Sequence, residues 1–199
     1  LVYKLLDPDF DISFIDLQEG LDGKVLQERI PPLKKSDLKV VVGNYPVTDK
    51  DLEDLIFGFK VTDTRHSNAI SFVLPTETGA IAIGVGGGTS DRISAAYQAM
   101  EKVVAYFLTK TIKKPLSEIP EKIEATLLMT SDGFFPDTGA LQAALPEEIE
   151  RVKGRIAKFP YITQRDQFLG KETLRLLESE KLSLEDKYLF IASRLKINV

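Results

Sequence analysis

The 199-residue sequence predicts an α/β fold with a mainly helical C-terminal segment, on three observations. An apolar strand that begins at residue 79 runs into a glycine turn, and the turn opens onto a long helix. A second strand, residues 69–73, precedes it across a short turn, so the two strands form a layer that the helix covers. After Pro146, charged stretches carry apolar residues at helical spacing. We therefore expect an α/β domain over residues 1–145 and a helical segment over residues 146–199.

The glycine turn, residues 84–91, has the composition of an anion cradle. Gly86 and Gly88 have no Cβ, which permits positive φ and lets a ligand approach the backbone closely. The unpaired amides at the start of the following helix favour an anion, and Arg92 stands beside them as a forked donor. A turn with no ligand is the competing interpretation.

The helix after this turn is expected to bury one face, formed by Ile93, Ala96, Tyr97, Met100, Val104 and Phe107. Thr89, Ser90 or Asp91 can each cap its first turn. No Gly-Lys-Ser/Thr follows the glycines, which excludes a P-loop, and Thr89 stands where the dinucleotide-binding fingerprint requires a third glycine.

Other elements surround this unit. Residues 12–26 read as two short strands and residues 38–42 as another. Thr48 caps a helix whose expected core face is Leu52, Leu55, Ile56 and Phe59. Residues 124–130 form a further strand, followed by the loop 131–137 with two adjacent phenylalanines.

The composition narrows the class of function. The net charge is −4 and no basic stripe is present, which argues against nucleic acid as the partner. The absence of cysteine excludes disulfides and thiolate chemistry, and a single histidine argues against a metal centre. No run of about 18 apolar residues is present, so we expect no membrane contact. These features are compatible with a cytoplasmic protein.

Three motifs follow one another in a specific order: His66-Ser67-Asn68-Ala69-Ile70 after a Leu-rich helix, the glycine turn closing on Arg92, and Ser131-Asp132-Gly133-Phe134-Phe135-Pro136. In this order they resemble the AICAR transformylase domain of the bifunctional purine-biosynthesis proteins. Members of that family carry Lys-Ser-Asn before a strand, Gly-x-Gly-x-Gly closing on Ser-Arg, and Ser-Asp-x-Phe-Phe-Pro. The resemblance covers roughly residues 37–144, with a weaker likeness over residues 12–29.

The resemblance implies a cytidine-deaminase-like, three-layer α/β/α fold without zinc. It also implies a cytoplasmic homodimer with active sites at the subunit interface. The family transfers the formyl group of 10-formyltetrahydrofolate, its co-substrate, to the 5-amino group of AICAR ribotide. On this basis we expect formyltransferase activity in purine biosynthesis, with AICAR ribotide and folate as partners.

Site residues follow from the same resemblance. Asn68 matches the asparagine that positions the substrate near the reacting amine, and His66 replaces the lysine of Lys-Ser-Asn. Arg92 and Ile93 match the pair that lies along the folate or the nucleotide. The remaining expected binding positions are Gly86, Gly88, Phe134 and Pro136, and the third catalytic position is Asp137.

Departures from the family pattern concern the same loops. In the third motif, Phe134 and Pro136 match the family loop that forms a wall for the pterin. One of the two adjacent phenylalanines is expected to pack in the core. Asp137 fills the role of the family aspartate only if two residues were deleted. Thr89 and Asp91 replace a glutamine and a serine, and the new carboxylate opposes an anion. The family's Lys-His pair, whose histidine transfers a proton, is not found in this chain.

Residue chemistry alone leaves several roles open. Formyl transfer needs a base, and His66 is the one side chain whose ordinary pKa suits it, but a histidine in a polar turn is also common on surfaces. Asn68 is equally a turn former, and Asp132 is either a ligand contact or a loop cap. A hydrolytic triad of Ser67, His66 and Asp63 is disfavoured, because adjacent residues on an extended segment point to opposite sides.

Two hypotheses therefore stand. The first is a folate-dependent formyltransferase that acts on AICAR ribotide, as part of a larger chain or a dimer. The second is a binding module of the same fold that keeps the nucleotide or folate cleft without catalysis, as the absent Lys-His pair and Asp91 suggest.

Overall fold

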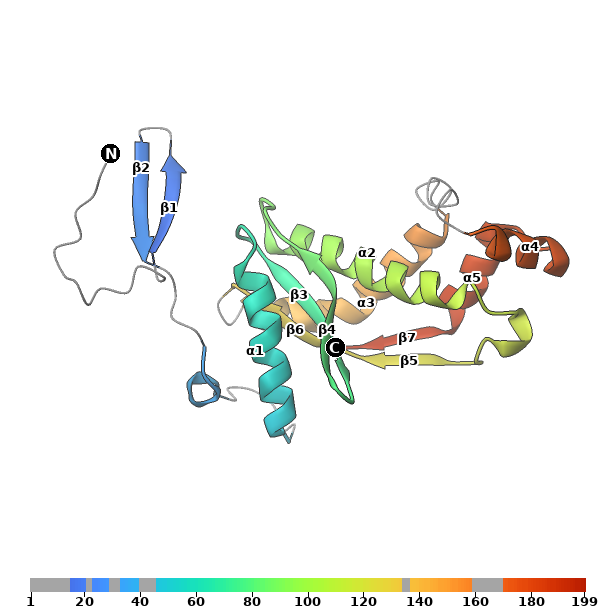
Figure 1. Ribbon diagram of the computed structural model, residues 1–199, viewed down its shortest axis with the longest axis horizontal. Coiled ribbons are helices and arrows are strands. Elements are labelled where there is room, and N and C mark those ends of the chain that lie inside the picture. The colour runs from blue at the N-terminus through green and yellow to red at the C-terminus, as the bar shows by residue number, and fades with distance from the viewer. Residues whose placement is uncertain (1–14, 21–22, 29–32, 40–45, 134–136, 159–169) are drawn as a thin grey trace. The chain divides into compact units, whose positions relative to one another are not determined.

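The computed structural model describes residues 15–20, 23–28, 33–39, 46–133, 137–158 and 170–199 (Figure 1). The chain divides into two compact units, Leu1–Val42 and Gly43–Val199, and each is described by itself.

The first unit contains a β-hairpin. Strand β1 (Ile15–Gly20) pairs antiparallel with β2 (Gly23–Glu28), with Leu17 opposite Leu26. This hairpin confirms the two strands predicted in this region. A short 3₁₀ helix follows at Lys35–Asp37. The strand predicted at residues 38–42 lies largely outside the described residues, and residues 38–39 are not in a strand.

The second unit is built on a three-stranded antiparallel sheet with β3 in its centre. Strand β3 (Ile70–Thr76) pairs on one side with β4 (Gly79–Gly86) and on the other with β6 (Leu128–Ser131). The predicted hairpin of two strands before the long helix is thereby confirmed. The central strand buries its first half on both faces, since its residues from Ile70 to Val73 are all fully buried.

A second, two-stranded sheet continues from the first. Strand β5 (Ile123–Thr126) is separated from β6 by Leu127 alone, and it pairs in parallel with β7 (Leu195–Asn198). The Leu127 N–H donates to the Asn198 carbonyl at 2.8 Å, so the one strand predicted at residues 124–130 is broken into two at this point. Strand β7, near the end of the chain, was not predicted from the sequence.

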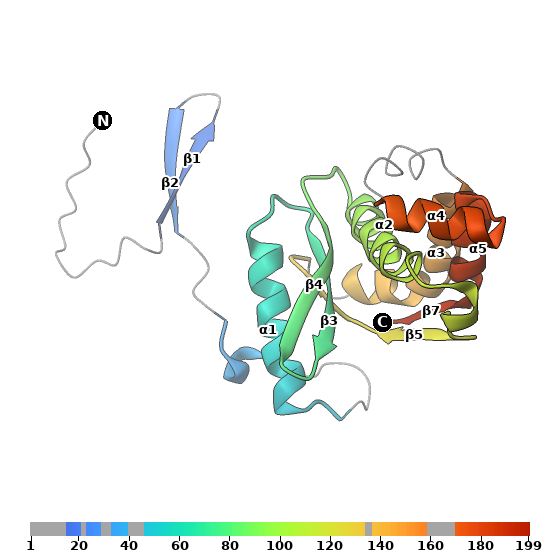
Figure 2. The same ribbon diagram turned by 45° about the vertical axis from the view of Figure 1, so that its right-hand side comes forward.

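Two helices cover opposite faces of the three-stranded sheet (Figure 2). Helix α1 (Asp49–Asp63) faces Ser71 and Thr130, whose hydroxyls both lie 2.9 Å from Thr62 Oγ1. Helix α2 (Arg92–Thr111) lies against the other face of the sheet, where β4 approaches its backbone. The α/β class predicted from the sequence is thus confirmed.

The predicted core face of α1 is wrong. Its buried residues are Asp54, Gly58 and Thr62, whereas the four apolar residues of the predicted face, Leu52, Leu55, Ile56 and Phe59, are each partly exposed. A Cβ on Gly58 would lie 2.7 Å from Val73 Cγ2, so glycine brings the helix close to the sheet along this stripe. The buried hydroxyls then satisfy one another, as buried polar groups require.

The start of α1 agrees with the prediction. Thr48 is the N-cap, its Oγ1 accepts from the Asp51 N–H at 3.2 Å, and the Asp51 carboxylate accepts from the Thr48 N–H at 2.8 Å. This reciprocal capping box satisfies two amides that the helix leaves open. The Thr48 hydrogen bonds lower the pKa of Asp51.

Three more helices lie in the described residues of the second unit. Helices α3 (Asp137–Lys158), α4 (Lys171–Glu180) and α5 (Leu184–Arg194) confirm the mainly helical character predicted after Pro146. The expected domain boundary after residue 145 falls inside α3, whose buried residues Leu141, Leu145, Ile149 and Val152 share one core cluster with α2 and α5. In the part of the chain that the structure describes, no helix is long and apolar enough to cross a membrane.

A buried ion pair ties α5 to α4. The Lys187 side chain is fully buried, and its Nζ donates to Glu180 Oε2 at 2.7 Å. The Leu116 N–H donates to the other oxygen at 2.6 Å. Burial alone would raise the pKa of Glu180, but the bond from Lys187, the Leu116 amide and the lysine charge outweigh it, so the pKa is lowered. The carboxylate form of Glu180 is therefore favoured at this position.

Replacing Lys187 with methionine should lower the free energy of unfolding by about 3–5 kcal/mol, because the Glu180 carboxylate loses its counter-charge. The double variant Lys187→Met, Glu180→Leu should recover most of this loss. Chemical denaturation followed by circular dichroism measures both, and equal losses in the two variants would contradict the ion-pair account.

The lowered pKa of Glu180 contributes stability above its ordinary value of 4.5, and this contribution is lost as the pH falls. The free energy of unfolding should therefore decline less steeply with acid in the double variant than in the wild type.

Candidate functional site

Three loops meet at one end of the three-stranded sheet because of its strand register. Ile70, the first residue of β3, is paired with Gly86 at the end of β4 and with Ser131 at the end of β6. The chain entering β3 therefore lies level with the chain leaving both neighbours. The loop 64–69, the glycine turn and the residues after β6 are brought together at this edge.

Asp132 connects two of these loops through both carboxylate oxygens. Oδ2 accepts from Ser67 Oγ at 2.5 Å, and Oδ1 accepts from the Ala69 N–H at 2.9 Å. The Asp132 N–H donates in turn to the Ala69 carbonyl at 3.3 Å. Arg92 Nη2 stands 3.8 Å from Oδ1, which adds an ion pair with the start of α2. One carboxylate after β6 thus contacts both the first loop and the start of α2.

Asn68 connects the first loop to the glycine turn. Its Nδ2 donates to the Thr89 carbonyl at 3.2 Å, and the Gly88 N–H donates to the His66 carbonyl at 2.7 Å. The amide nitrogen of Asn68 is therefore occupied by the turn. Within the described part of the chain, nothing donates to its Oδ1, which leaves that oxygen as an acceptor for a donor on a ligand.

Arg92 lies against Gly133 in the loop after β6. A Cβ on Gly133 would lie 2.2 Å from Arg92 Cζ and Nε, so a larger residue there would displace the guanidinium from this position. One fifth of the Arg92 side-chain surface is exposed. The sequence analysis did not single out Gly133, although its place in the third motif was the available signal.

The glycines of the turn have different roles. A Cβ on Gly86 would lie 2.0 Å from the Ala95 carbonyl oxygen, and one on Gly84 would lie 2.3 Å from that of Ala99. These two positions need glycine because β4 packs directly on the backbone of α2. Gly88 has φ +69°, in the left-handed region, and a Cβ there would meet nothing closer than His66 Cβ at 3.9 Å. Gly88 therefore faces the open side of the turn.

The start of α2 already holds a negative charge. Among the three capping candidates, Asp91 is the N-cap: Oδ1 accepts from the Ser94 N–H at 2.8 Å and Oδ2 accepts from Ser94 Oγ at 2.8 Å. The Ser94 backbone and side-chain bonds lower the pKa of Asp91, which keeps the carboxylate charged. An anion at these amides would have to displace or adjoin this carboxylate.

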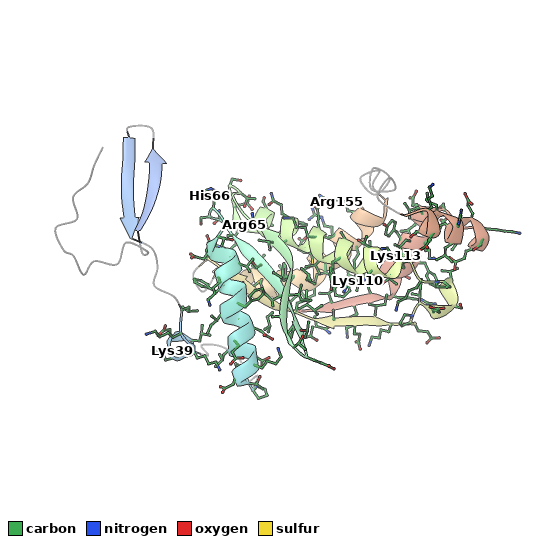
Figure 3. The ribbon with its side chains drawn as sticks, viewed as in Figure 1. Lys39, Arg65, His66, Lys110, Lys113 and Arg155 are labelled. Atoms are coloured by element: carbon green, nitrogen blue, oxygen red, sulfur yellow. The ribbon has the colours of Figure 1, made fainter. Side chains whose placement is uncertain are left out.

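His66 and Arg65 are both exposed in the loop after α1 (Figure 3), where a Cβ on Gly87 would lie 2.9 Å from Arg65 Cβ and 3.1 Å from the His66 carbonyl oxygen. The Ser67 hydroxyl donates to Asp132, so the described contacts give it no partner in His66 or Asp63. This arrangement agrees with the low weight that the sequence gives to a hydrolytic triad.

Other predicted positions lie at the margin of the junction or outside the described residues. The side chain of Ile93 is exposed (58%) on the first turn of α2, beside an apolar groove that includes Tyr97. Asp137 is the first residue of α3, and its side chain lies outside the described residues, as do Phe134 and Pro136. In the described ranges no group of three or more His, Cys, Asp or Glu side chains could hold a metal ion.

The sequence has similarity to a known enzyme family. A family model described as the AICARFT/IMPCHase bienzyme matches residues 7–102, which include the first loop, the glycine turn and Arg92. The bifunctional purine biosynthesis protein PurH of Caldicellulosiruptor saccharolyticus is 29% identical over 143 residues, covering 72% of this chain and 24% of that protein. PurH of Magnetococcus marinus is 31% identical over 135 residues, covering 67% and 23%.

A shorter match has higher identity. PurH of Clostridium botulinum (strain Loch Maree / Type A3) is 38% identical over 82 residues, which cover 41% of this chain and 15% of that protein. The chain spans about a quarter or less of the length of these curated relatives.

The fold and the three joined loops define an α/β domain with a polar site at one edge of its sheet. The matches confirm the resemblance that the three motifs indicated. The chain is a partial and divergent relative of the AICARFT/IMPCHase bienzymes of purine biosynthesis.

Substituting Gly86 and Gly88 one at a time should separate the cost of a steric overlap from the cost of a left-handed backbone. Gly86→Ala should lower the free energy of unfolding by roughly 3 kcal/mol or more, because its Cβ would overlap the Ala95 carbonyl. Gly88→Ala should cost only about 1–2 kcal/mol, since the penalty there is the left-handed backbone alone. Thermal and chemical unfolding of the two variants measure the difference. A larger loss for Gly88→Ala would contradict the assigned roles.

Proposed function

We propose that this chain binds AICAR ribotide at the junction of the three loops and takes part in formyl transfer from 10-formyltetrahydrofolate in purine biosynthesis. The observation that carries the proposal is the meeting of three loops in a relative of the AICARFT/IMPCHase bienzymes: Asn68 is hydrogen-bonded to the glycine turn, and Asp132 holds Ala69 by a hydrogen bond and Arg92 by an ion pair. Residues far apart in the sequence are thereby gathered into one polar site. The activity is that of a phosphoribosylaminoimidazolecarboxamide formyltransferase.

Each residue has a chemical task in this proposal. Arg92 offers a forked, permanently charged donor to a phosphate or carboxylate. The free Oδ1 of Asn68 accepts from the 5-amino group and orients it, because Nδ2 is engaged by Thr89. His66 is proposed as the base that accepts the proton that this amine loses, since imidazole is the side chain most often used for this task. Gly86 and Gly88 supply the backbone path of the turn, and the Gly88 side is the open one.

The residues present fit a folate at the same place. The exposed face of Ile93 adjoins Arg92, so a flat ring and an acidic tail would find an apolar surface beside a cation. When bound, 10-formyltetrahydrofolate supplies the formyl group. Phe134 and Pro136 are proposed to form a wall for the pterin, and Asp137 to act with His66 and Asn68.

Further parts of the proposal rest on the family resemblance. A cytidine-deaminase-like α/β/α arrangement is supported by helices on both faces of the sheet. We also propose a homodimer located in the cytoplasm. The family's Lys-His pair is not found in this chain, whose single histidine is His66, preceded by an arginine. We therefore propose that proton transfer is carried out by His66 or by residues supplied from outside this chain.

A second function is favoured by one observation, the Asp91 cap. This carboxylate occupies the amides at the start of α2 that would otherwise attract an anion. The alternative is therefore a non-catalytic module that binds a nucleotide or a folate without turnover. Binding and turnover measured side by side separate the two functions.

Calorimetric titration of the chain with AICAR ribotide should show binding that Arg92→Ala weakens by at least roughly tenfold, since a charge-assisted hydrogen bond is lost. Lys113→Ala, just beyond the C-terminal end of α2, is the matched control and should bind as the wild type does (Figure 3). Addition of 10-formyltetrahydrofolate should then release tetrahydrofolate. Binding without release would favour the binding module, and no binding of either compound would reject both functions.

Asp91→Asn tests the charge at the helix start. Asparagine caps helices as well as aspartate does, so the fold should be kept while the negative charge is removed. Affinity for AICAR ribotide should rise roughly two- to fivefold at low salt. Calorimetry of the variant against the wild type measures this. An unchanged affinity at low salt would mean that the phosphate does not lie near the start of α2.

A further inference from the structure

We infer that Asp132 is the positioning residue of the proposed site: its carboxylate fixes Asn68 and Arg92 relative to each other, without itself touching the substrate. The inference rests on the proposed function for its ligand, but its structural part stands on the contacts alone. Asp132 belongs to the third loop, whereas the two residues that it positions belong to the first loop and to α2.

The carboxylate is shared between neighbours of Asn68. Oδ2 accepts from the Ser67 hydroxyl and Oδ1 accepts from the Ala69 N–H, so the residues on either side of Asn68 are both held by the same group. On its other side, Asn68 is held by the Thr89 carbonyl. The third loop therefore holds the residues on both sides of Asn68, while the glycine turn holds its side chain through Nδ2 and Oδ1 is left to a ligand.

The same carboxylate sets the position of Arg92. Nη2 lies 3.8 Å from Oδ1, and the guanidinium rests on Gly133, the residue after Asp132. Asp132 thus supplies the charge that attracts the guanidinium, and the next residue, Gly133, supplies the surface that it contacts. At 3.8 Å the contact is an ion pair rather than a short hydrogen bond, so Asp132 orients the guanidinium through its charge.

The direct ligand role that the sequence left open for Asp132 is the less suitable one. Both oxygens are already engaged by the protein, and a carboxylate would repel the phosphate of the proposed substrate. Asp132 therefore acts on a ligand indirectly, through the residues whose positions its carboxylate fixes.

Asp132→Asn is the sharpest variant, because asparagine can still accept from the Ala69 N–H but cannot pair with Arg92. We expect the melting temperature to stay close to that of the wild type and affinity for AICAR ribotide to fall roughly fivefold or more. Asp132→Ala should lower the affinity further, by about tenfold or more, since Ser67 and Ala69, on either side of Asn68, then lose their hydrogen bonds to the carboxylate. Glu77→Gln, in the turn between β3 and β4, removes a charge elsewhere and should change neither quantity.

A second readout separates this inference from the proposed function. In ¹H–¹⁵N spectra of the chain without ligand, Asp132→Asn should shift the Arg92 Nε–H resonance, and Asp132→Ala should in addition shift the Asn68 side-chain amide and speed hydrogen exchange at the Ala69 amide. If the wild type fails to bind AICAR ribotide, the proposed function fails, and these shifts still support the positioning role. Unchanged Arg92 and Asn68 resonances in both variants would overturn it, as would an unchanged affinity in a wild type that does bind.

Discussion

The pairing of one residue with two strands sets the geometry of this site. Ile70 stands opposite Gly86 on one side and Ser131 on the other, which places the start of the central strand level with the ends of both neighbours. Three loops are then close enough for single side chains to bridge them. Asp132 and Asn68 do so with hydrogen bonds, and Arg92 completes the junction with an ion pair. Without this register, the three motifs would remain separate turns.

Close packing of α2 on β4 carries the register into the site. Gly84 and Gly86 let the strand lie on the helix backbone, and no other residue type would fit at either position. The start of α2, with Asp91 and Arg92, is consequently fixed against the sheet edge. Part of the glycine turn thus serves to pack β4 against α2. Among the glycines of the turn, Gly88 is the one that has a left-handed backbone and faces open space. A site of this kind gains its precision from rigid elements that carry it.

Much of the fold followed from local pattern, and the errors have physical causes. The β3–β4 hairpin and the Thr48 cap depend on neighbouring residues, so the sequence alone predicts them. The buried face of α1 was wrong, because Gly58 and a hydroxyl cluster across three elements replace an apolar stripe. Strand β7 was missed, since a four-residue alternation is too short a signal without its partner β5. In the site, the convergence of motifs could be anticipated from their order, whereas the two-sided role of Asp132 depends on pairs of atoms that only the folded chain brings together.

The central claim is that one ligand, AICAR ribotide, is recognised by the three loops acting together. An amide chemical-shift map of the chain during titration with AICAR ribotide tests it most directly. The account predicts that residues 66–69, 86–92 and 131–133 shift together, with a single saturation curve. Shifts confined to one of these segments, or centred on α4 and α5, would contradict it.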